Sequence, residues 1–162
     1  MKISKALIYL LFSLLLLTSP TLFAANEQDL VDAAFKGNMD KVKTYLQSGV
    51  FVNGKDKQGN TALCVAVRNN NIDMVRLLLD SSADANLADS AKEAPFMIAF
   101  SKSNFEIMKA LLDKNADVNI VDASGKSPLR IACEKNYTEI IAMLLKYIYY
   151  GSKRTNAGGF TL

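Results

Sequence analysis

Two cysteines are the residues whose type could support nucleophilic or metal chemistry in this chain. Cys64 and Cys133 are its only thiols, and the sequence contains no histidine. A catalytic cysteine needs a base to form its thiolate, and histidine usually serves as that base. Zinc sites need several Cys, His or carboxylate ligands close together. We therefore predict no cysteine enzyme, no metal site and no cofactor.

Four aspartates recur along the chain and could be read as acid–base groups. Asp56 and Asp122 share one phase of the recurrence, and Asp84 and Asp117 share another. A general acid and base must converge on one substrate, whereas a regular recurrence separates these residues. Because Asn and Gly residues surround them, we interpret the four aspartates as residues that cap tight turns.

The triplet Gly125-Lys126-Ser127 looks like the end of a phosphate-binding loop. That motif also needs a glycine where Ile120 stands and a preceding β-strand. The same three residues fit a turn between repeated units. We therefore predict no phosphate site and no catalytic residues.

The first 24 residues have the order of features found in secretory signal peptides. Lys2 and Lys5 are followed by the apolar run 6–17, interrupted only by Ser13, and then by Pro20 and a small residue at position 24. The apolar run is shorter than the roughly 20 residues that span a bilayer. We expect residues 1–24 to be removed on export to a bacterial periplasm or out of the cell, with an uncleaved anchor as the alternative.

Composition leaves a nearly neutral exported chain with material for one core. The full sequence has 19 Lys and Arg residues against 16 Asp and Glu residues, a formal net charge of +3, and two of the cations lie in the leader. Such a balance favours neither nucleic acid nor an anionic membrane as the partner. Hydrophobic residues make up 50% of the chain, which suffices for one domain over residues 25–162.

A period of 33 residues runs through the exported part of the chain. Residues 71–89, NIDMVRLLLDSSADANLAD, are echoed by residues 104–122, NFEIMKALLDKNADVNIVD. The period aligns apolar residues in columns, for example Leu30, Leu63, Phe96 and Leu129, or Leu46, Leu79, Leu112 and Leu145. Units that repeat in this way bury their apolar faces by stacking on their neighbours.

Each unit is predicted to contain two helices. Residues 61–66 begin a short helix, Asn69, Asn70 and Asn71 form a loop, and residues 74–79 place apolar side chains at helical spacing. The Asn- and Gly-rich segment 53–59 is typical of a tight reversal. We expect an all-α fold with units at about 26–58, 59–91, 92–124 and 125–150, followed by a C-terminal tail.

Two motifs recur within these units. One appears as TALCVA at residues 61–66, APFMIA at 94–99 and SPLRIA at 127–132, and the other as SADAN at 82–86 and NADVN at 115–119. They resemble the Thr-Pro-Leu-His-x-Ala and Gly-Ala-Asp-Val-Asn motifs of ankyrin repeats. The resemblance implies a solenoid of helix-loop-helix units with short β-turn fingers, and a non-catalytic protein–protein interaction module.

The histidine of the family motif is absent from this chain. Cys64, Met97 and Arg130 stand in its place. Because that histidine ties one turn to the next in the family, we expect looser turns and a less stable stack. Cys64 and Cys133 lie two units apart, roughly 20 Å, beyond the Cα separation of about 7 Å that a disulfide allows. We predict two free, mostly buried thiols.

The resemblance further implies that the concave face of the stack binds a partner protein. Lys36, Asn69, Lys102 and Lys135 share one column of the period, with Arg68 beside Asn69. Few acids, Glu93 and Glu134, oppose these cations, so a partner with an acidic surface is expected, with ordinary solvated lysines as the alternative. The predicted partner-binding residues are Lys36, Lys55, Lys57, Arg68, Asn69, Lys102, Lys126 and Lys135.

The aromatic C-terminus suggests two further roles for the chain. Tyr147, Tyr149, Tyr150 and Phe160 could form a docking patch or fold over the last unit as a lid. An exposed patch would suit a self-associating component of a cell-envelope assembly. A third possibility is an accessory protein or inhibitor of an exported enzyme.

Overall fold

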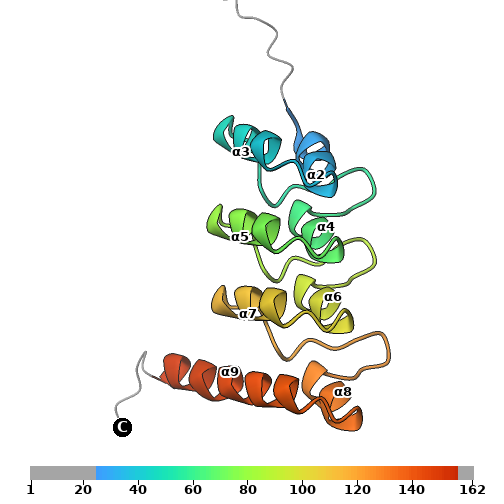
Figure 1. Ribbon diagram of the computed structural model, residues 1–162, viewed down its shortest axis with the longest axis vertical. Helices are drawn as coiled ribbons and strands as arrows, with labels where there is room; N and C mark the ends of the chain where they lie inside the picture. The colour runs from blue at the N-terminus through green and yellow to red at the C-terminus, as the bar shows by residue number, and fades with distance from the viewer. Residues whose placement is uncertain (1–24, 157–162) are drawn as a thin grey trace, which may run out of the picture.

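Four antiparallel helix pairs form the part of the chain that the computed structural model describes, namely the backbone of residues 25–156 and the side chains of residues 25–149. The predicted leader lies outside these residues. The pairs follow one another along the long axis of the molecule (Figure 1). Their helices are α2 (Glu27–Phe35), α3 (Met39–Gln47), α4 (Ala62–Arg68), α5 (Ile72–Asp80), α6 (Pro95–Ser101), α7 (Phe105–Asp113), α8 (Pro128–Glu134) and α9 (Thr138–Asn156).

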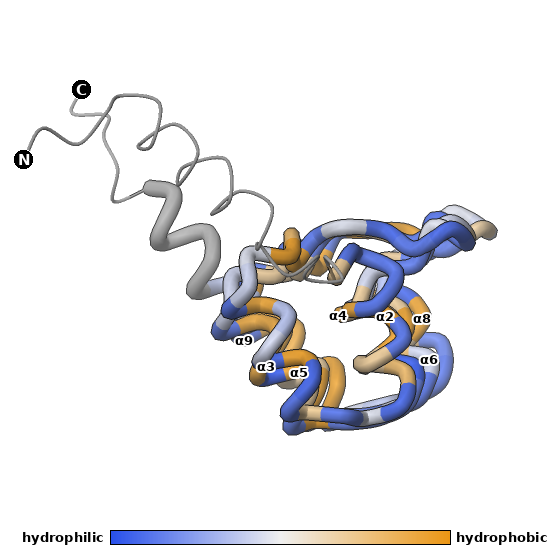
Figure 2. Tube along the Cα trace, turned by 90° about the horizontal axis from the view of Figure 1, so that it is seen from above, coloured by the Kyte–Doolittle hydropathy of each residue, from blue (hydrophilic) through white to orange (hydrophobic). Residues whose placement is uncertain are grey.

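The helices form two layers. The inner layer contains α2, α4, α6 and α8, and the outer layer contains α3, α5, α7 and α9. Viewed along the stack, the hydrophobic residues of the two layers face each other, and the loops between repeats project together to one side (Figure 2). Within residues 25–156 the only extended pairing is an isolated β-bridge between Lys55 and Thr61. The predicted all-α solenoid with short fingers is confirmed.

Asparagine side chains cap the N-termini of three outer helices, α3, α5 and α7. The side chains of Asn38, Asn71 and Asn104 each accept a hydrogen bond from the backbone N–H three residues later. Such N-caps each stabilise a helix by about 1 kcal/mol. The predicted Asn loop is confirmed, and Asn71 also caps α5. Asn70 supplies the left-handed turn before it, with φ 58°.

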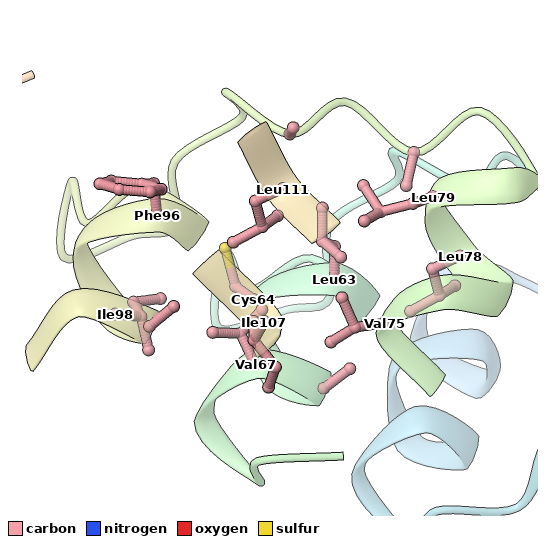
Figure 3. Close-up of a cluster of buried hydrophobic side chains, with 14 of the residues drawn as sticks. Leu63, Cys64, Val67, Val75, Leu78, Leu79, Phe96, Ile98, Ile107 and Leu111 are labelled. Atoms are coloured by element: carbon pink, nitrogen blue, oxygen red, sulfur yellow. The ribbon is translucent and has the colours of Figure 1, made fainter. Parts of the chain in front are cut away.

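The core lies between the two layers and between successive repeats. Leu63 and Val67 of α4 join Val75 of α5 and Ile107 and Leu111 of α7 in one buried cluster (Figure 3). A column of fully buried alanines lets the inner helices approach closely, and its members are Ala66, Ala99 and Ala132. The spacing of apolar residues in the sequence is therefore the spacing of the core.

Asparagines also link each repeat to the next. The side chain of Asn53 accepts a hydrogen bond of 2.8 Å from the Asp84 N–H, and Asn86 accepts one of 2.7 Å from the Asp117 N–H. Since both donors are backbone groups, these bonds fix the separation of neighbouring repeats while the apolar core supplies the stabilisation.

The last helix is longer than the sequence predicts. The expected tail begins at Gly151, but α9 continues to Asn156 and contains 19 residues, against nine in α7. One glycine inside a helix costs only about 1 kcal/mol, so Gly151 does not end it. Figure 1 shows α9 projecting past the edge of the stack.

Tyr147 fastens α9 to the repeat above it. Its hydroxyl donates a hydrogen bond of 2.5 Å to the Asp113 carboxylate at the end of α7, and the ring packs against the core. Tyr147 thus packs against the stack as a lid would, whereas Tyr149 is 55% exposed. The side chain of Tyr150, and all of Phe160, lie outside the described residues.

Substituting Phe for Tyr147 should destabilise the chain by about 0.5–1.5 kcal/mol at neutral pH. Burial, and then the Asp113 hydrogen bond and charge, raise the pKa of Tyr147 to about 12. Because the unfolded-state pKa is about 10, the stabilisation is complete below pH 10 and is lost as the pH rises towards 12. Urea unfolding across this pH range should show the two proteins converging above pH 10. A constant difference between them would contradict the assignment.

Candidate functional site

The recurring aspartates hold the turns between repeats. The Asp56 carboxylate accepts hydrogen bonds from the N–H groups of Gln58 and Asn60, and Asp84 and Asp117 each accept one from the residue two positions later. Their predicted capping role is confirmed. Asp122 does the same in the last finger, where the Lys126 N–H and then the Ser124 hydroxyl lower its pKa.

The finger between the second and third repeats, residues 88–93, contains a charged network that was not predicted from the sequence. The Asp89 side chain is buried and pairs with the Arg68 guanidinium, which also donates to the side chains of Asn60, at 3.2 Å, and Glu93, at 3.5 Å. The other Asp89 oxygen accepts from the N–H groups of Ala91 and Glu93. Arg68 was expected to meet a partner protein, but the structure uses it to join the second repeat to the third.

Three other predicted site residues also have partners inside the chain. Lys55 Nζ donates to the Ala88 carbonyl at 2.8 Å, and Asn69 Nδ2 donates to the Phe35 carbonyl at 2.9 Å. Lys126 pairs with Glu134 at 2.5 Å. The hydrogen bond from Lys126, and then that from Arg130, lower the pKa of Glu134.

The other four lysines of the predicted set have no carboxylate partner among the side chains that the structure describes. Lys36, Lys102 and Lys135 are the C-cap residues of α2, α6 and α8, and Lys57 lies in the first finger. All four are exposed. Lys135 Nζ lies 5.8 Å from the centre of the Tyr137 ring. The structure thus places the three C-cap lysines in one column of the inner layer.

An exposed phenylalanine stands beside the first lysine of this column. Phe35 precedes Lys36 at the end of α2 and is 65% exposed. Repeat-equivalent positions hold Arg68, Ser101 and Glu134, so the aromatic side chain is peculiar to the first repeat. Aromatic side chains are enriched in protein interfaces. Phe35 is not among the residues predicted from the sequence to bind a partner.

The two thiols differ in environment. Cys64 is fully buried, and its thiol lies 3.6 Å from the Leu87 carbonyl and 4.0 Å from the Glu93 carbonyl of the next finger. The Cys64 thiol therefore forms weak hydrogen bonds to the next turn, at the position where the family's histidine is expected to link the two turns. Both thiols are free, as predicted, but Cys133 is exposed, so the expectation of two buried thiols was wrong. Its repeat equivalent Val67 is covered by the following repeat, and Cys133 has no such cover in the described chain.

A thiol reagent should react with Cys133 at least about tenfold faster than with Cys64. Burial raises the pKa of the Cys64 thiol, which lowers the fraction of reactive thiolate and also blocks the reagent. Labelling of dilute native protein followed by peptide mass spectrometry will give both rates, with the urea-unfolded chain as the control. Equal rates in the native protein would contradict this burial pattern.

Neither a metal-binding group nor a membrane-spanning helix occurs among the described residues. No group of three or more Cys, Asp or Glu side chains in residues 25–149 is placed to hold a metal ion. Across the described helices, none combines the length and apolar character needed to cross a bilayer. The inner face presents cations at repeat spacing, with the aromatic side chain of Phe35 at one end.

Comparison with known families matches this architecture to two models. The model for ankyrin repeats (many copies) matches residues 30–79, and the model for ankyrin repeats (3 copies) matches residues 81–156. A search of the curated proteins finds no match. The two matches include all or part of each of the four helix pairs and agree with their stacking. The chain belongs to the ankyrin repeat family.

Proposed function

We propose that the chain is an exported, non-catalytic module that binds another protein through the concave side formed by its inner helices and fingers. Ankyrin repeats are generally protein–protein interaction modules. The observation that supports a binding role for this side is the column of exposed lysines at the ends of α2, α6 and α8, none of which has a carboxylate partner among the described side chains.

Charge is the expected basis of recognition. Repeats stacked at about 10 Å carry the lysines to positions that carboxylates on a facing surface could match. Each exposed ion pair contributes little by itself, but several cations on one face steer an acidic partner and raise its association rate. Phe35, next to Lys36, would supply an apolar anchor at the α2 end of the face.

Export is part of the proposal because the leader has the features of a signal peptide. The partner is then a protein of the periplasm or of the cell exterior. Lys55, Arg68, Asn69 and Lys126 would shape the fingers through their internal bonds, and Lys57 would add to the charge of the face.

A pull-down from cell-envelope extract with paired charge-reversal variants tests the proposal. One variant replaces Lys36, Lys102 and Lys135 by Glu on the inner face. The control replaces Lys41, Lys43 and Lys109 by Glu on the outer helices, so both variants have the same net charge.

A protein bound by the wild type and by the control, but lost from the inner-face variant, is the expected result. Its association rate at low salt should fall at least about tenfold for the inner-face variant. Equal retention by both variants would place the binding surface elsewhere.

A further inference from the structure

The end of the stack formed by α8 and α9 exposes positions that the upper repeats bury. Leu145 shares a column with Leu79 and Leu112, which are 4% and 5% exposed, yet it is itself 51% exposed. Cys133 shares a column with the fully buried Val67 and is exposed. In a solenoid, the next repeat covers such positions. The fourth repeat therefore ends in an open interface of the kind that holds the stack together.

The opposite end of the stack is polar. Asp29 caps α2 by accepting the Asn26 N–H, and Asp32 accepts a hydrogen bond from Gln28. In the lower repeats the columns of these two aspartates hold only apolar residues, namely Ala62, Pro95 and Pro128, and Val65, Ile98 and Ile131. The first repeat thus resembles a capping unit, and the fourth does not.

The exposed side of α9 carries a regular stripe. Thr138, Ala142, Leu145 and Tyr149 follow one another at steps of four, three and four residues, the spacing of a helix-pairing seam, and all four are exposed. Tyr147, on the far side of the helix, is bonded to Asp113 of the repeat above. The stripe therefore points away from the stack.

Two opposite charges flank the stripe. Glu139 and Lys146 lie seven residues apart, which places them on the same edge of the helix, and both are exposed. Neither has an ion-pair partner among the described side chains. Both are available to a facing surface.

We propose that this face of α9 binds a second copy of the chain, tail to tail, with the two α9 helices antiparallel about a two-fold axis. Antiparallel pairing centred between residues 143 and 144 places Leu145 against Ala142 of the second copy. It also places Tyr149 near Thr138, so that a large side chain meets a small one in each layer. Every contact occurs twice, as two-fold symmetry requires.

Charge selects the same arrangement. With this centre, Glu139 faces Lys146 of the second copy, and the reciprocal pair forms as well. Parallel pairing would instead place Lys146 beside the apolar Ile141 of the second copy. Head-to-tail stacking, with the first repeat of one copy on the fourth repeat of another, would bury Asp32 against the apolar residues of the fourth repeat. The stripe is therefore complementary to itself in one orientation, which identifies a second copy of this chain as its occupant.

Sedimentation of the purified chain over a wide concentration range tests the proposal. We expect a monomer–dimer equilibrium that Leu145→Glu abolishes or weakens more than about tenfold, because the substitution places two carboxylates in the apolar seam. Since Leu145 is half exposed in the single chain, the variant should keep its helical circular dichroism. Phe51→Glu alters an exposed apolar residue in the first repeat, which is 61% exposed, and should leave the dimer unchanged.

Charge exchange provides a test that folding defects cannot imitate. Glu139→Lys alone and Lys146→Glu alone each place like charges together and should each weaken the dimer about tenfold. The double variant restores both pairs and should recover wild-type dimerisation within about threefold.

Three results would overturn the proposal. The first is a chain that remains monomeric up to about 1 mM, which would include the case of a face covered by the chain itself. The second is growth beyond a dimer. The third is a dimer that withstands Leu145→Glu or is not rescued by the double exchange.

Discussion

Truncating Leu79 to Ala is expected to lower the free energy of unfolding by about 2–5 kcal/mol. Leu79 lies between the second and third repeats, is 4% exposed and belongs to the continuous core. The shorter side chain leaves a cavity that rigid neighbouring helices fill only in part. Because domains are typically stable by only about 5–15 kcal/mol, this change should shift the urea midpoint strongly.

Leu145→Ala is the matched control for this experiment, since the two leucines occupy the same column two repeats apart. Leu145 is 51% exposed, so its truncation should cost less than about 1 kcal/mol when measured on dilute, monomeric protein. Equal costs for the two variants would mean that the assigned repeat boundaries are wrong.

Replacing Asp89 by Ala should cost about 2–4 kcal/mol. The change removes the carboxylate that pairs with Arg68 and that accepts the N–H groups of Ala91 and Glu93. A partly buried guanidinium and two turn donors are then left without their acceptor. Urea unfolding followed by circular dichroism measures the loss.

Asp122→Ala is the corresponding control, because Asp122 holds the same position in the next finger without an arginine partner. We expect about 1 kcal/mol for its loss. Adding Arg68→Ala to the Asp89 variant should cost little more, since the pair is already broken. Additive losses from the two substitutions would show that the pair does not act as a unit.

The repeat, the helices and the core were predictable because one period controls all three. A column such as Leu63, Phe96 and Leu129 is apolar in every unit, which is the requirement for stacking. Turn aspartates were predictable for the same reason, since Asp56 and Asp122 recur in phase. Periodic information in the sequence thus specifies the features that every repeat shares.

Features that break the period were harder to predict. Arg68 has no equivalent cation in the other repeats, and its pairing with Asp89 depends on how the finger folds back. Cys133 belongs to a buried column but is exposed, because it lies in the last repeat and no fifth repeat covers it in the described chain. One sequence signal for the network was available. Arg68 is not repeated in the other units, and the finger that follows its repeat is the one that contains a glutamate, Glu93.

The binding role of the candidate face stays a prediction, but the structure separates the residues that are bonded inside the stack from those that are not. Lys55, Lys126 and Asn69 are drawn into bonds within the stack, because each can reach an acceptor there. Lys36 and Lys102 lie at helix ends and form no ion pair with a carboxylate among the described side chains. Side-chain reach, rather than column membership, decides which cations stay available for a partner.

Hydrogen–deuterium exchange of the chain, alone and with the captured envelope protein, tests most directly the claim that its concave side is the binding surface. Slower exchange should be confined to the C-terminal ends of α2, α4, α6 and α8 and to the fingers around residues 55–60, 88–93 and 122–127. Protection restricted to α3, α5 and α7 would contradict the claim.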